Sequence, residues 1–450
     1  MNISYNIFKK VKEDAIKLDL NESDFECHPQ VKQDIIECVQ NDHTLSRYSN
    51  VFNQNTTNLL DKLSQINQVA PEQILLTAGS DDALNYIVTR YITSKTNVFM
   101  FAPTYNMFEI MVKRRTDHIF YIPTDFNTSE LKDLDICFDF YKTLMPYSLV
   151  YIVHPNNPLG YILNKTDIER VIKMYPSTIF VIDEAYIEFK PEASCIDLTK
   201  RYRNVIVTRT FSKAYGLAGI RLGYLVAHQE TLDFIRILYN EKHVTEIAKV
   251  AGLAVLNQKD YYQTLVDTII KERESFKTFL RGFGIFYTDS HGNFISFYVG
   301  ENTKQFLQLL ETNGVYLRDR ESQLNMKGFV RITIGKKEHL DVIRDLIQKN
   351  IHLFTFDCQK RYEIPQNEIW KIKSMYTQVV ELLKSKSIHC KLRSMAVHDL
   401  IHIHTSGLNV FRILSLEPEF NKLNLRIFPS ENGYLLSNAN TDHPIIEIIF

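Results

Sequence analysis

The stretch NVIVTRTFSKAYGLAGIRLGYLVA, residues 204–227, places two apolar runs on either side of a polar segment that holds a single lysine, Lys213. Both runs are rich in β-branched residues and do not alternate with polar ones, which is typical of strands buried on both faces. Thr210, Ser212 and Arg221 accompany the lysine. Two hydroxyls and an arginine can cradle a phosphate, with the amine as a nucleophile at its rim. We therefore interpret Lys213 as a positioned chemical group and not as a surface charge.

Similar apolar runs upstream predict the rest of a sheet. Helical patterns such as DDALNYIVTRYI and NKTDIERVIKMY lie between them, and this alternation favours an α/β fold with an open, mostly parallel sheet and helices on both faces. The further strand candidates are residues 73–78, 97–103, 148–155 and 178–185. Ligands of such sheets bind at the carboxyl ends of the strands. Polar residues that follow these runs are therefore candidate site residues.

Two of these strand ends carry groups suited to an anion or a flat ring. Gly79, Ser80 and Asp81 stand between a strand and a helix, where free N–H groups can hold a phosphate. Asp81 or Asp82 could equally be a plain helix N-cap. Tyr105 follows the next strand and could lie flat on a planar cofactor or simply pack in a loop.

The next two strand ends carry an amide and a carboxylate. Asn157 lies in HPNNPLG, which by itself is ordinary turn chemistry. Asp183 and Tyr186 lie in VIDEAY at the end of a buried run. A buried carboxylate is costly unless it meets a cation such as a protonated pyridine nitrogen, and the alternative is a helix cap or a core network.

Composition excludes several classes of protein. The chain has 450 residues, 45% of them hydrophobic and 23% charged, and its net charge is -1, so we expect neither nucleic acid nor a membrane surface as a partner. No apolar run approaches the roughly 20 residues that span a bilayer, and no signal peptide is expected. The six cysteines are scattered without a CxxC pair, which favours a cytoplasmic protein with reduced thiols.

The pattern changes after about residue 256. A long helix over 260–284 and alternating strands over 293–299 and 329–335 predict a smaller α+β domain that also takes in the N-terminal arm. We expect an appended α+β domain after it, with a helix over 366–386 and strand-like pieces up to 444–450. The predicted division is an arm (1–45), a large domain (46–256), a small domain (257–354) and the appended domain (355–450).

The appended segment also holds a group of histidines. His398 and His402 have the i,i+4 spacing of two ligands on one helix face, and His404 follows. The segment lacks HExxH, so we expect no metal site and interpret the histidines as satisfied or solvent-facing.

Taken together, the order of these motifs resembles the pyridoxal-phosphate-dependent aminotransferases of fold type I, and within them the histidinol-phosphate aminotransferases. The resemblance covers about residues 15–350. The segments that carry it are LDLNES (18–23), LSRY (45–48), APEQILLTAGSDDAL (70–84), APTY (102–105), HPNNPLG (154–160), VIDEAYIEF (181–189), TRTFSKAYGLAGIRLGY (208–224), NFISF (293–297), GVYLR (314–318) and VRITIG (330–335).

The resemblance implies pyridoxal phosphate as the cofactor and a role for each residue around its ring. Lys213 would bind the cofactor covalently and move the proton, and Asp183 would hold the protonated ring nitrogen. Tyr186 and Asn157 would hydrogen-bond the ring oxygen, while Tyr105 would stack on the ring.

The resemblance also implies a phosphate site shared between subunits. Tyr48 would reach the phosphate from the neighbouring subunit, so a homodimer is expected. The phosphate itself would be surrounded by Gly79, Ser80, Asp81, Thr210, Ser212 and Arg221.

Two arginines and one asparagine are the substrate residues that the resemblance implies. They are Asn21, Arg318 and Arg331, and the expected reaction moves an amino group between glutamate, or a similar donor, and a small phosphorylated compound such as histidinol phosphate. For Arg318 the alternative is a surface ion pair in a charged stretch, with Asp319, Arg320 and Glu321 beside it. Decarboxylation of a phosphorylated amino acid is the alternative reaction.

Three departures bear on the substrate and on partners. Leu159 stands where the family usually has threonine, and LNESDFECHP replaces the family's usual segment in the arm that closes over the substrate. The substrate can therefore differ from histidinol phosphate. Residues 355–450 lie beyond the resemblance, and an interaction or regulatory module is one hypothesis for them.

Overall fold

The computed structural model describes residues 15–41, 43–49, 53–123, 147–323 and 326–355, together with five strands between residues 390 and 449. Its largest unit is a seven-stranded sheet with the order β2-β8-β7-β6-β5-β3-β4. The strands are β2 (Ile74–Thr77), β3 (Val98–Ala102), β4 (Ile119–Pro123), β5 (Leu149–Val153), β6 (Ile179–Asp183), β7 (Val205–Thr210) and β8 (Gly223–Ala227). All six strands predicted for this sheet are present, and β4 is an addition.

The sheet is mostly parallel, as predicted. Among the strands described here, β8 alone runs against its neighbours, since it pairs antiparallel with both β7 and β2. The other carboxyl ends therefore meet at one edge. The loop from β7 to β8 returns at that same edge, where Thr210 is the register partner of Gly223.

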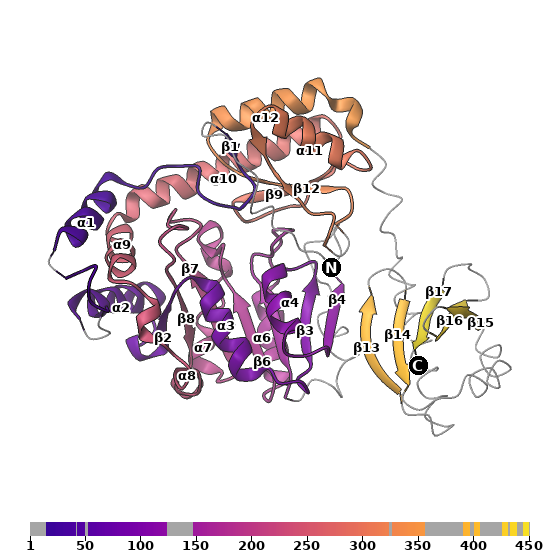
Figure 1. Ribbon diagram of the computed structural model, residues 1–450, viewed down its shortest axis with the longest axis horizontal. Helices are drawn as coiled ribbons and strands as arrows, with labels where there is room; N and C mark the ends of the chain where they lie inside the picture. The colour runs from indigo at the N-terminus through magenta and orange to yellow at the C-terminus, as the bar shows by residue number, and fades with distance from the viewer. Residues whose placement is uncertain are drawn as a thin grey trace.

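Helices cover both faces of the sheet, which confirms the predicted layers (Figure 1). One face packs on α2 (Gln54–Asn67), α6 (Lys165–Met174), α7 (Leu198–Arg201) and α9 (Glu246–Asn257). The other face packs on α3 (Ser80–Tyr91), α4 (Asn106–Lys113) and α8 (Gln229–Arg236). Successive strand residues alternate between the two cores, so each strand is apolar throughout.

A second, three-stranded sheet has the order β11-β12-β9 and its own hydrophobic core. Its strands are β9 (Phe294–Tyr298), β11 (Arg318–Asp319) and β12 (Phe329–Thr333), and its helices are α10 (Lys259–Gly282), α11 (Thr303–Thr312) and α12 (Lys337–Lys349). Because α10 places Tyr262 in the large core and Phe276 in the small one, it ties the two units together. The domain boundary near residue 256 stays a prediction.

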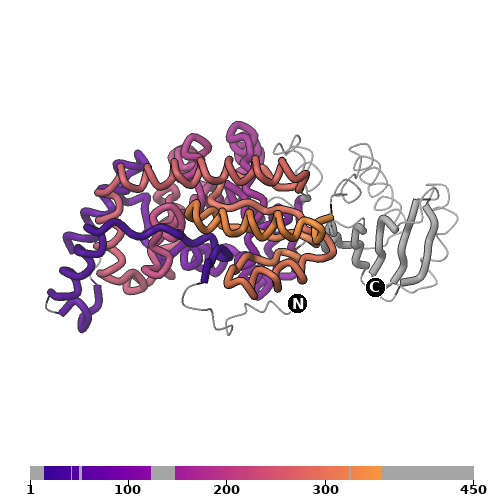
Figure 2. Tube along the Cα trace, turned by 90° about the horizontal axis from the view of Figure 1, so that it is seen from above, coloured from indigo at the N-terminus to yellow at the C-terminus, as the bar shows by residue number. Residues whose placement is uncertain are grey.

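The N-terminal segment joins this second unit. Figure 2 shows it running from α1 (Pro29–Gln40) along the molecule to the helices of the small sheet. There β1 (Ile16–Lys17) pairs in parallel with β10 (Val315–Tyr316). Leu18, which follows β1, is buried in the small core. The arm thus reaches the side of the molecule that faces the large sheet.

Five further strands form a separate sheet with the order β13-β14-β17-β16-β15. They are β13 (Cys390–Ala396), β14 (Leu400–Thr405), β15 (Leu425–Ser430), β16 (Gly433–Asn438) and β17 (Pro444–Ile449). The strand expected at 444–450 is present as β17, and the helix expected over 366–386 lies outside the described residues. The helical interpretation of His402 was wrong, because His402 lies in β14; His398 lies outside the described residues.

Short 3-10 helices complete the described elements, at Pro71–Gln73, Ile187–Phe189, Pro191–Ala193, Glu241–His243 and Ile351–Leu353. In the part of the chain that the structure describes, none of the helices combines the length and the apolar character that a membrane crossing requires.

Candidate active site

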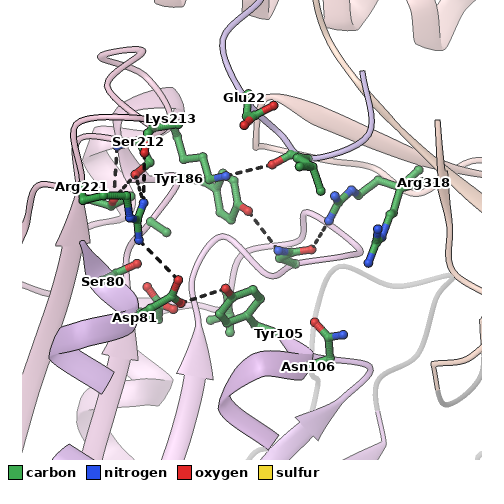
Figure 3. A pocket seen from close by; sticks show the side chains of 18 of the residues that line it. Glu22, Ser80, Asp81, Tyr105, Asn106, Tyr186, Ser212, Lys213, Arg221 and Arg318 are labelled. Carbon is green, nitrogen blue, oxygen red and sulfur yellow. Dashed lines mark hydrogen bonds and ion pairs between the residues drawn. The ribbon is translucent and has the colours of Figure 1, made fainter. Parts of the chain in front are cut away.

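A pocket of about 210 Å³ opens at the carboxyl edge of the large sheet and faces the three-stranded sheet (Figure 3). Twelve of the residues expected at the site line it: Ser80, Asp81, Tyr105, Asn157, Asp183, Tyr186, Thr210, Ser212, Lys213, Arg221, Arg318 and Arg331. Gly79, Asn21 and Tyr48 lie outside its lining. The residues come from both sheets, so the pocket exists only once the two units are packed together.

The return of the chain from β7 to β8 explains why Arg221 reaches the pocket. Arg221 has a φ of +59° just before β8 begins, which turns its side chain back toward the start of α3. Gly79 makes room for that side chain, because a Cβ on Gly79 would lie 2.6 Å from Arg221 Nη2. Gly79 thus shapes one wall of the pocket without lining it. Its φ of +85° also suits glycine best.

The hydroxyls and the guanidinium around Arg221 form the corner expected for a phosphate. Arg221 Nη1 donates to Ser212 Oγ at 3.4 Å, and Thr210 Oγ1 donates to the same oxygen at 3.0 Å. Ser80 lies in the first turn of α3 beside them. The first turn of a helix offers N–H groups and a positive dipole end to an anion. The corner can therefore hold a phosphate group.

Asp81 faces the pocket and does not cap α3, so the N-cap interpretation was wrong for this residue. Gly79 occupies the N-cap position, and Asp82 Oδ2 accepts a hydrogen bond from the Ala78 amide at 3.0 Å. Asp81 instead accepts a hydrogen bond from the Tyr105 hydroxyl at 2.8 Å and lies 3.6 Å from Arg221 Nη2. The tyrosine ring is thus tied to the phosphate corner.

Asp183 lies at the base of the pocket and is 2% exposed. Its Oδ2 accepts from the Tyr151 hydroxyl at 2.8 Å and its Oδ1 from the Thr208 hydroxyl at 3.1 Å. Burial raises the pKa of the Asp183 carboxyl to about 6, although these two hydrogen bonds oppose the shift. Both of these partners are neutral hydroxyls, so a cation in the pocket would stabilise the carboxylate strongly.

Lys213 stands above this carboxylate with its amine directed at the arm. Its Nζ donates to the Leu20 carbonyl at 3.0 Å and lies 5.9 Å from the centre of the Tyr186 ring. Burial lowers the pKa of the Lys213 amine from 10.5 to about 8, and the nearby Arg331 guanidinium adds to the shift. A substantial neutral fraction near physiological pH is what a nucleophilic lysine needs.

A chain of hydrogen bonds connects Tyr186 through Asn157 to Arg331 on the three-stranded sheet. The Asn157 amide donates to the Tyr186 hydroxyl at 3.0 Å, while the Asn157 carbonyl accepts from Arg331 Nη1 at 2.6 Å. The Asn21 amide also donates to the Tyr186 hydroxyl, at 3.0 Å. Asn21 is fully buried behind the tyrosine, so it supports Tyr186, and its direct contact with a substrate stays a prediction.

The three-stranded sheet presents a row of guanidinium groups to the pocket. Arg318 and Arg331 are register partners on the antiparallel pair β11 and β12, which puts them side by side on one face. Arg331 Nη2 donates to the Asp19 carbonyl at 2.8 Å. Arg318 lines the pocket, which favours the substrate interpretation of this residue over the surface ion pair.

Arg320 is the third arginine that the small sheet contributes to the pocket, and sequence reasoning placed it only in a charged surface stretch. It is 5% exposed and lines the pocket, two residues beyond Arg318 and hence on the same side of the strand. Its amide donates to the Phe329 carbonyl, which continues the strand register. Gln323 Nε2 then donates to the Thr104 carbonyl at 2.8 Å and ties this loop to the large sheet. The i,i+2 spacing to Arg318 was the available signal.

Tyr48 lies at the surface of its own chain instead of in this pocket. Its side chain is 81% exposed, and Lys242 Nζ lies 4.8 Å from the centre of its ring. Its predicted action on a neighbouring subunit's site stays a prediction.

The donor set fits a phosphorylated pyridine aldehyde. The buried Asp183 carboxylate can bind a cation such as the protonated ring nitrogen, and Lys213, with its lowered pKa, can react with the aldehyde. The corner at Ser212 and Arg221 can bind the phosphate. Five cationic side chains line the pocket against three carboxylates, since Lys213, Arg221, Arg318, Arg320 and Arg331 face Glu22, Asp81 and Asp183. The excess of positive charge suits anionic ligands.

Comparison with known proteins agrees with this geometry. Residues 13–347 match the family model described as aminotransferase class I and II. The chain is 30% identical over 355 residues to the dihydroxyacetone phosphate transaminase Cj1437c of Campylobacter jejuni, which covers 78% of this chain and 94% of that protein. It is 29% identical over 335 residues to a histidinol-phosphate aminotransferase of Ruminiclostridium cellulolyticum, which covers 73% and 91%.

A solved structure shares the fold and carries the expected cofactor. Histidinol-phosphate aminotransferase from Sinorhizobium meliloti, determined in complex with pyridoxal 5'-phosphate, superposes with a TM-score of 0.66 at 22% identity over 76% of this chain and 92% of that one. The superposition confirms the fold type I prediction, and the family match over residues 13–347 confirms the predicted cofactor. The chain belongs to the class I and II aminotransferases and depends on pyridoxal phosphate.

Proposed function

We propose that this aminotransferase moves an amino group between glutamate, or a similar donor, and a small phosphorylated carbonyl compound. The observation that carries the proposal is the row of three guanidinium groups beside Lys213. Two guanidiniums suffice for the carboxylates of a donor, and a third one favours an acceptor with a phosphate dianion, which accepts paired N–H donors well. Dihydroxyacetone phosphate and imidazole acetol phosphate, the keto partner of histidinol phosphate, are the acceptors we expect.

The bound cofactor supplies an aldehyde for the amine and a ring that withdraws electrons from the reacting carbon. Asp183 offers a buried carboxylate to the protonated ring nitrogen, and that cation brings the pKa of the carboxyl down. Asn157 and the Tyr186 hydroxyl, which are bonded to each other, would hold the ring oxygen. Such preorganised contacts would orient the ring before the reaction begins.

Lys213 is the group that holds and moves the proton in this proposal. Its Nζ stands between the Tyr186 ring and the Leu20 carbonyl, within the space that the substrate's reacting carbon must enter. Because its pKa is about 8, the amine can both take up and give back a proton near neutral pH. Arg331, held by Asn157 and by the Asp19 carbonyl, binds the anionic group nearest to that carbon.

We also propose a homodimer in which Tyr48 of one chain acts on the phosphate corner of the other. The exposure of Tyr48 on its own chain and the exposure of the Arg221 side chain at the phosphate corner support this. For the separate sheet β13 to β17 we keep the hypothesis of an interaction module. Truncation after residue 355 tests that hypothesis, because a folded and fully active product would place the module outside catalysis.

Decarboxylation of a phosphorylated amino acid needs the same electron sink and the same anion pocket, so the fold cannot separate it from aminotransfer. The curated relatives named above are aminotransferases, which favours aminotransfer. The discriminating test of the acceptor uses a matched pair. Dihydroxyacetone phosphate should be used at least ~100-fold more efficiently than dihydroxyacetone, since several charge-assisted hydrogen bonds are lost without the phosphate. Equal efficiency with the two compounds would contradict the proposal that the pocket binds the acceptor through its phosphate.

A further inference from the structure

Glu246, in the first turn of α9, forms hydrogen bonds to the chain that follows Tyr48. Glu246 Oε2 accepts hydrogen bonds from the Ser49 hydroxyl and from Asn53 Nδ2, both at 2.6 Å. Glu246 Oε1 accepts from Asn55 Nδ2, also at 2.6 Å. Lys249 Nζ donates to the Ser49 hydroxyl at 2.7 Å. Ser49, Asn53 and Asn55 are thus held by Glu246, and Ser49 also by Lys249, which lies three residues further along α9.

The same network sets the start of two helices. Asn53 is the N-cap of α2, where its Oδ1 accepts from the Thr56 amide at 2.8 Å while its Nδ2 donates to Glu246. Glu246 is the first residue of α9, where a negative charge is favoured by the helix dipole. Although burial opposes it, the hydrogen bonds from Ser49, Asn55 and Asn53 lower the pKa of Glu246. The carboxylate therefore stays charged at the junction of α2 and α9.

This rigidity contrasts with the exposure of the residue beside it. Lys249 is 2% exposed and the Glu246 side chain 17%, whereas Tyr48 is 81% exposed. A large exposed aromatic side chain next to a part-buried polar network is suited to a contact outside its own chain. Lys242, from the 3-10 helix Glu241–His243, adds a cation 4.8 Å from the ring centre.

We propose that Glu246 is a positioning residue that fixes Tyr48 for insertion into the cofactor phosphate corner of a second copy of this chain. The inference rests on the proposed homodimer and deepens it, because it assigns the holding of one subunit's cofactor to a carboxylate of the other. Ser49 transmits the effect, since it is next to Tyr48 in the chain and bonds both Glu246 and Lys249.

The first test measures cofactor affinity instead of activity. Glu246→Gln replaces an acceptor oxygen by an N–H donor that faces other donors, so the Kd for pyridoxal phosphate should rise about tenfold, the usual scale for one lost charged hydrogen bond. Ser49→Ala removes the hydroxyl contacts with Glu246 and Lys249, leaves the Asn53 and Asn55 contacts at the start of α2 intact and should raise the Kd by a smaller factor. Glu230→Gln removes a first-turn carboxylate from α8 and should leave the Kd unchanged. Unchanged affinity in both Glu246→Gln and Ser49→Ala would overturn the proposal.

The second test asks in which subunit the effect appears, through the fraction of cofactor that borohydride fixes to Lys213. In a mixed dimer of a Lys213→Ala chain and a Glu246→Gln chain, the surviving lysine receives Tyr48 from an intact loop, and we expect wild-type affinity. In a mixed dimer of an unsubstituted chain and a chain with both substitutions, the surviving site receives Tyr48 from the altered loop, and we expect weakened affinity. The opposite assignment, or a monomeric chain, contradicts the proposal. Neither readout requires aminotransfer, so failure of the proposed reaction would be seen separately.

Discussion

The two walls of the pocket are built in different ways. The wall on the large sheet consists of short motifs that follow strands, so that Asp81, Asp183 and Lys213 are brought together by the strand order of one sheet. The wall on the small sheet depends on contacts between distant parts of the chain, such as the Asn21 amide to Thr333 Oγ1, 312 residues apart. The cofactor wall can therefore be recognised from local motifs, whereas the substrate wall depends on how the two units pack.

Lys213→Ala breaks the cofactor wall most severely. We expect activity to fall by at least ~10³-fold, since both the nucleophile and the acid–base group are lost. Steady-state assays with glutamate as donor measure this. Lys173→Ala, an exposed lysine on α6, is the control and should keep full activity. Retention of activity without the Lys213 amine would contradict the assignment of its role.

Asp183→Asn tests the carboxylate at the base of the same wall. We expect a ~10²-fold loss of activity, the scale for removing one preorganised electrostatic group. The apoenzyme should meanwhile melt at a higher temperature at pH 8. A carboxyl whose folded pKa is raised from 3.8 to about 6 loses stability as pH rises through that window, and the amide carries no such cost. A lower melting temperature with unchanged activity would argue for a purely structural Asp183.

Arg320→Gln tests whether this arginine of the substrate wall binds the phosphorylated acceptor. The KM for a phosphorylated acceptor should rise about tenfold, by the usual worth of a charged hydrogen bond, while the half-reaction with glutamate changes little. Asp319→Asn changes the exposed neighbour in β11 and serves as the matched control. An equal loss with both half-reactions would assign Arg320 to general structure and not to acceptor binding.

Arg331 on the substrate wall also acts electrostatically on Lys213 on the cofactor wall, and this interaction gives the smallest of the expected effects. Because burial and Arg331 hold the pKa of Lys213 near 8, the rate at which the apoenzyme takes up the cofactor should reach half its plateau near pH 8. Arg331→Met should move this midpoint upward, toward the ordinary value for lysine. The midpoint is measured from the rate at which the cofactor absorbance band rises at each pH. A midpoint that is unchanged in Arg331→Met would contradict the electrostatic coupling between Arg331 and Lys213.

The same division explains what could be predicted from the sequence. Six strands of the large sheet and the residues after them follow from continuous apolar runs, while β4 (Ile119–Pro123) was not predicted although IFYIP is itself a short apolar run. The strand β8 was predicted, but its antiparallel direction was not, and this direction is what brings Arg221 to Ser212. Arg320 was missed because neighbouring charges suggested solvent, and its burial depends on the tie from Gln323 to Thr104.

The most direct test of the central claim adds glutamate alone to the enzyme carrying pyridoxal phosphate and follows the cofactor spectrum in a single turnover. We expect the absorbance band of the aldehyde form to be replaced by that of the aminated cofactor, with one 2-oxoglutarate formed per site. Addition of dihydroxyacetone phosphate or imidazole acetol phosphate should then restore the original band. An unchanged spectrum with glutamate, together with release of CO₂ from a phosphorylated amino acid, would contradict it.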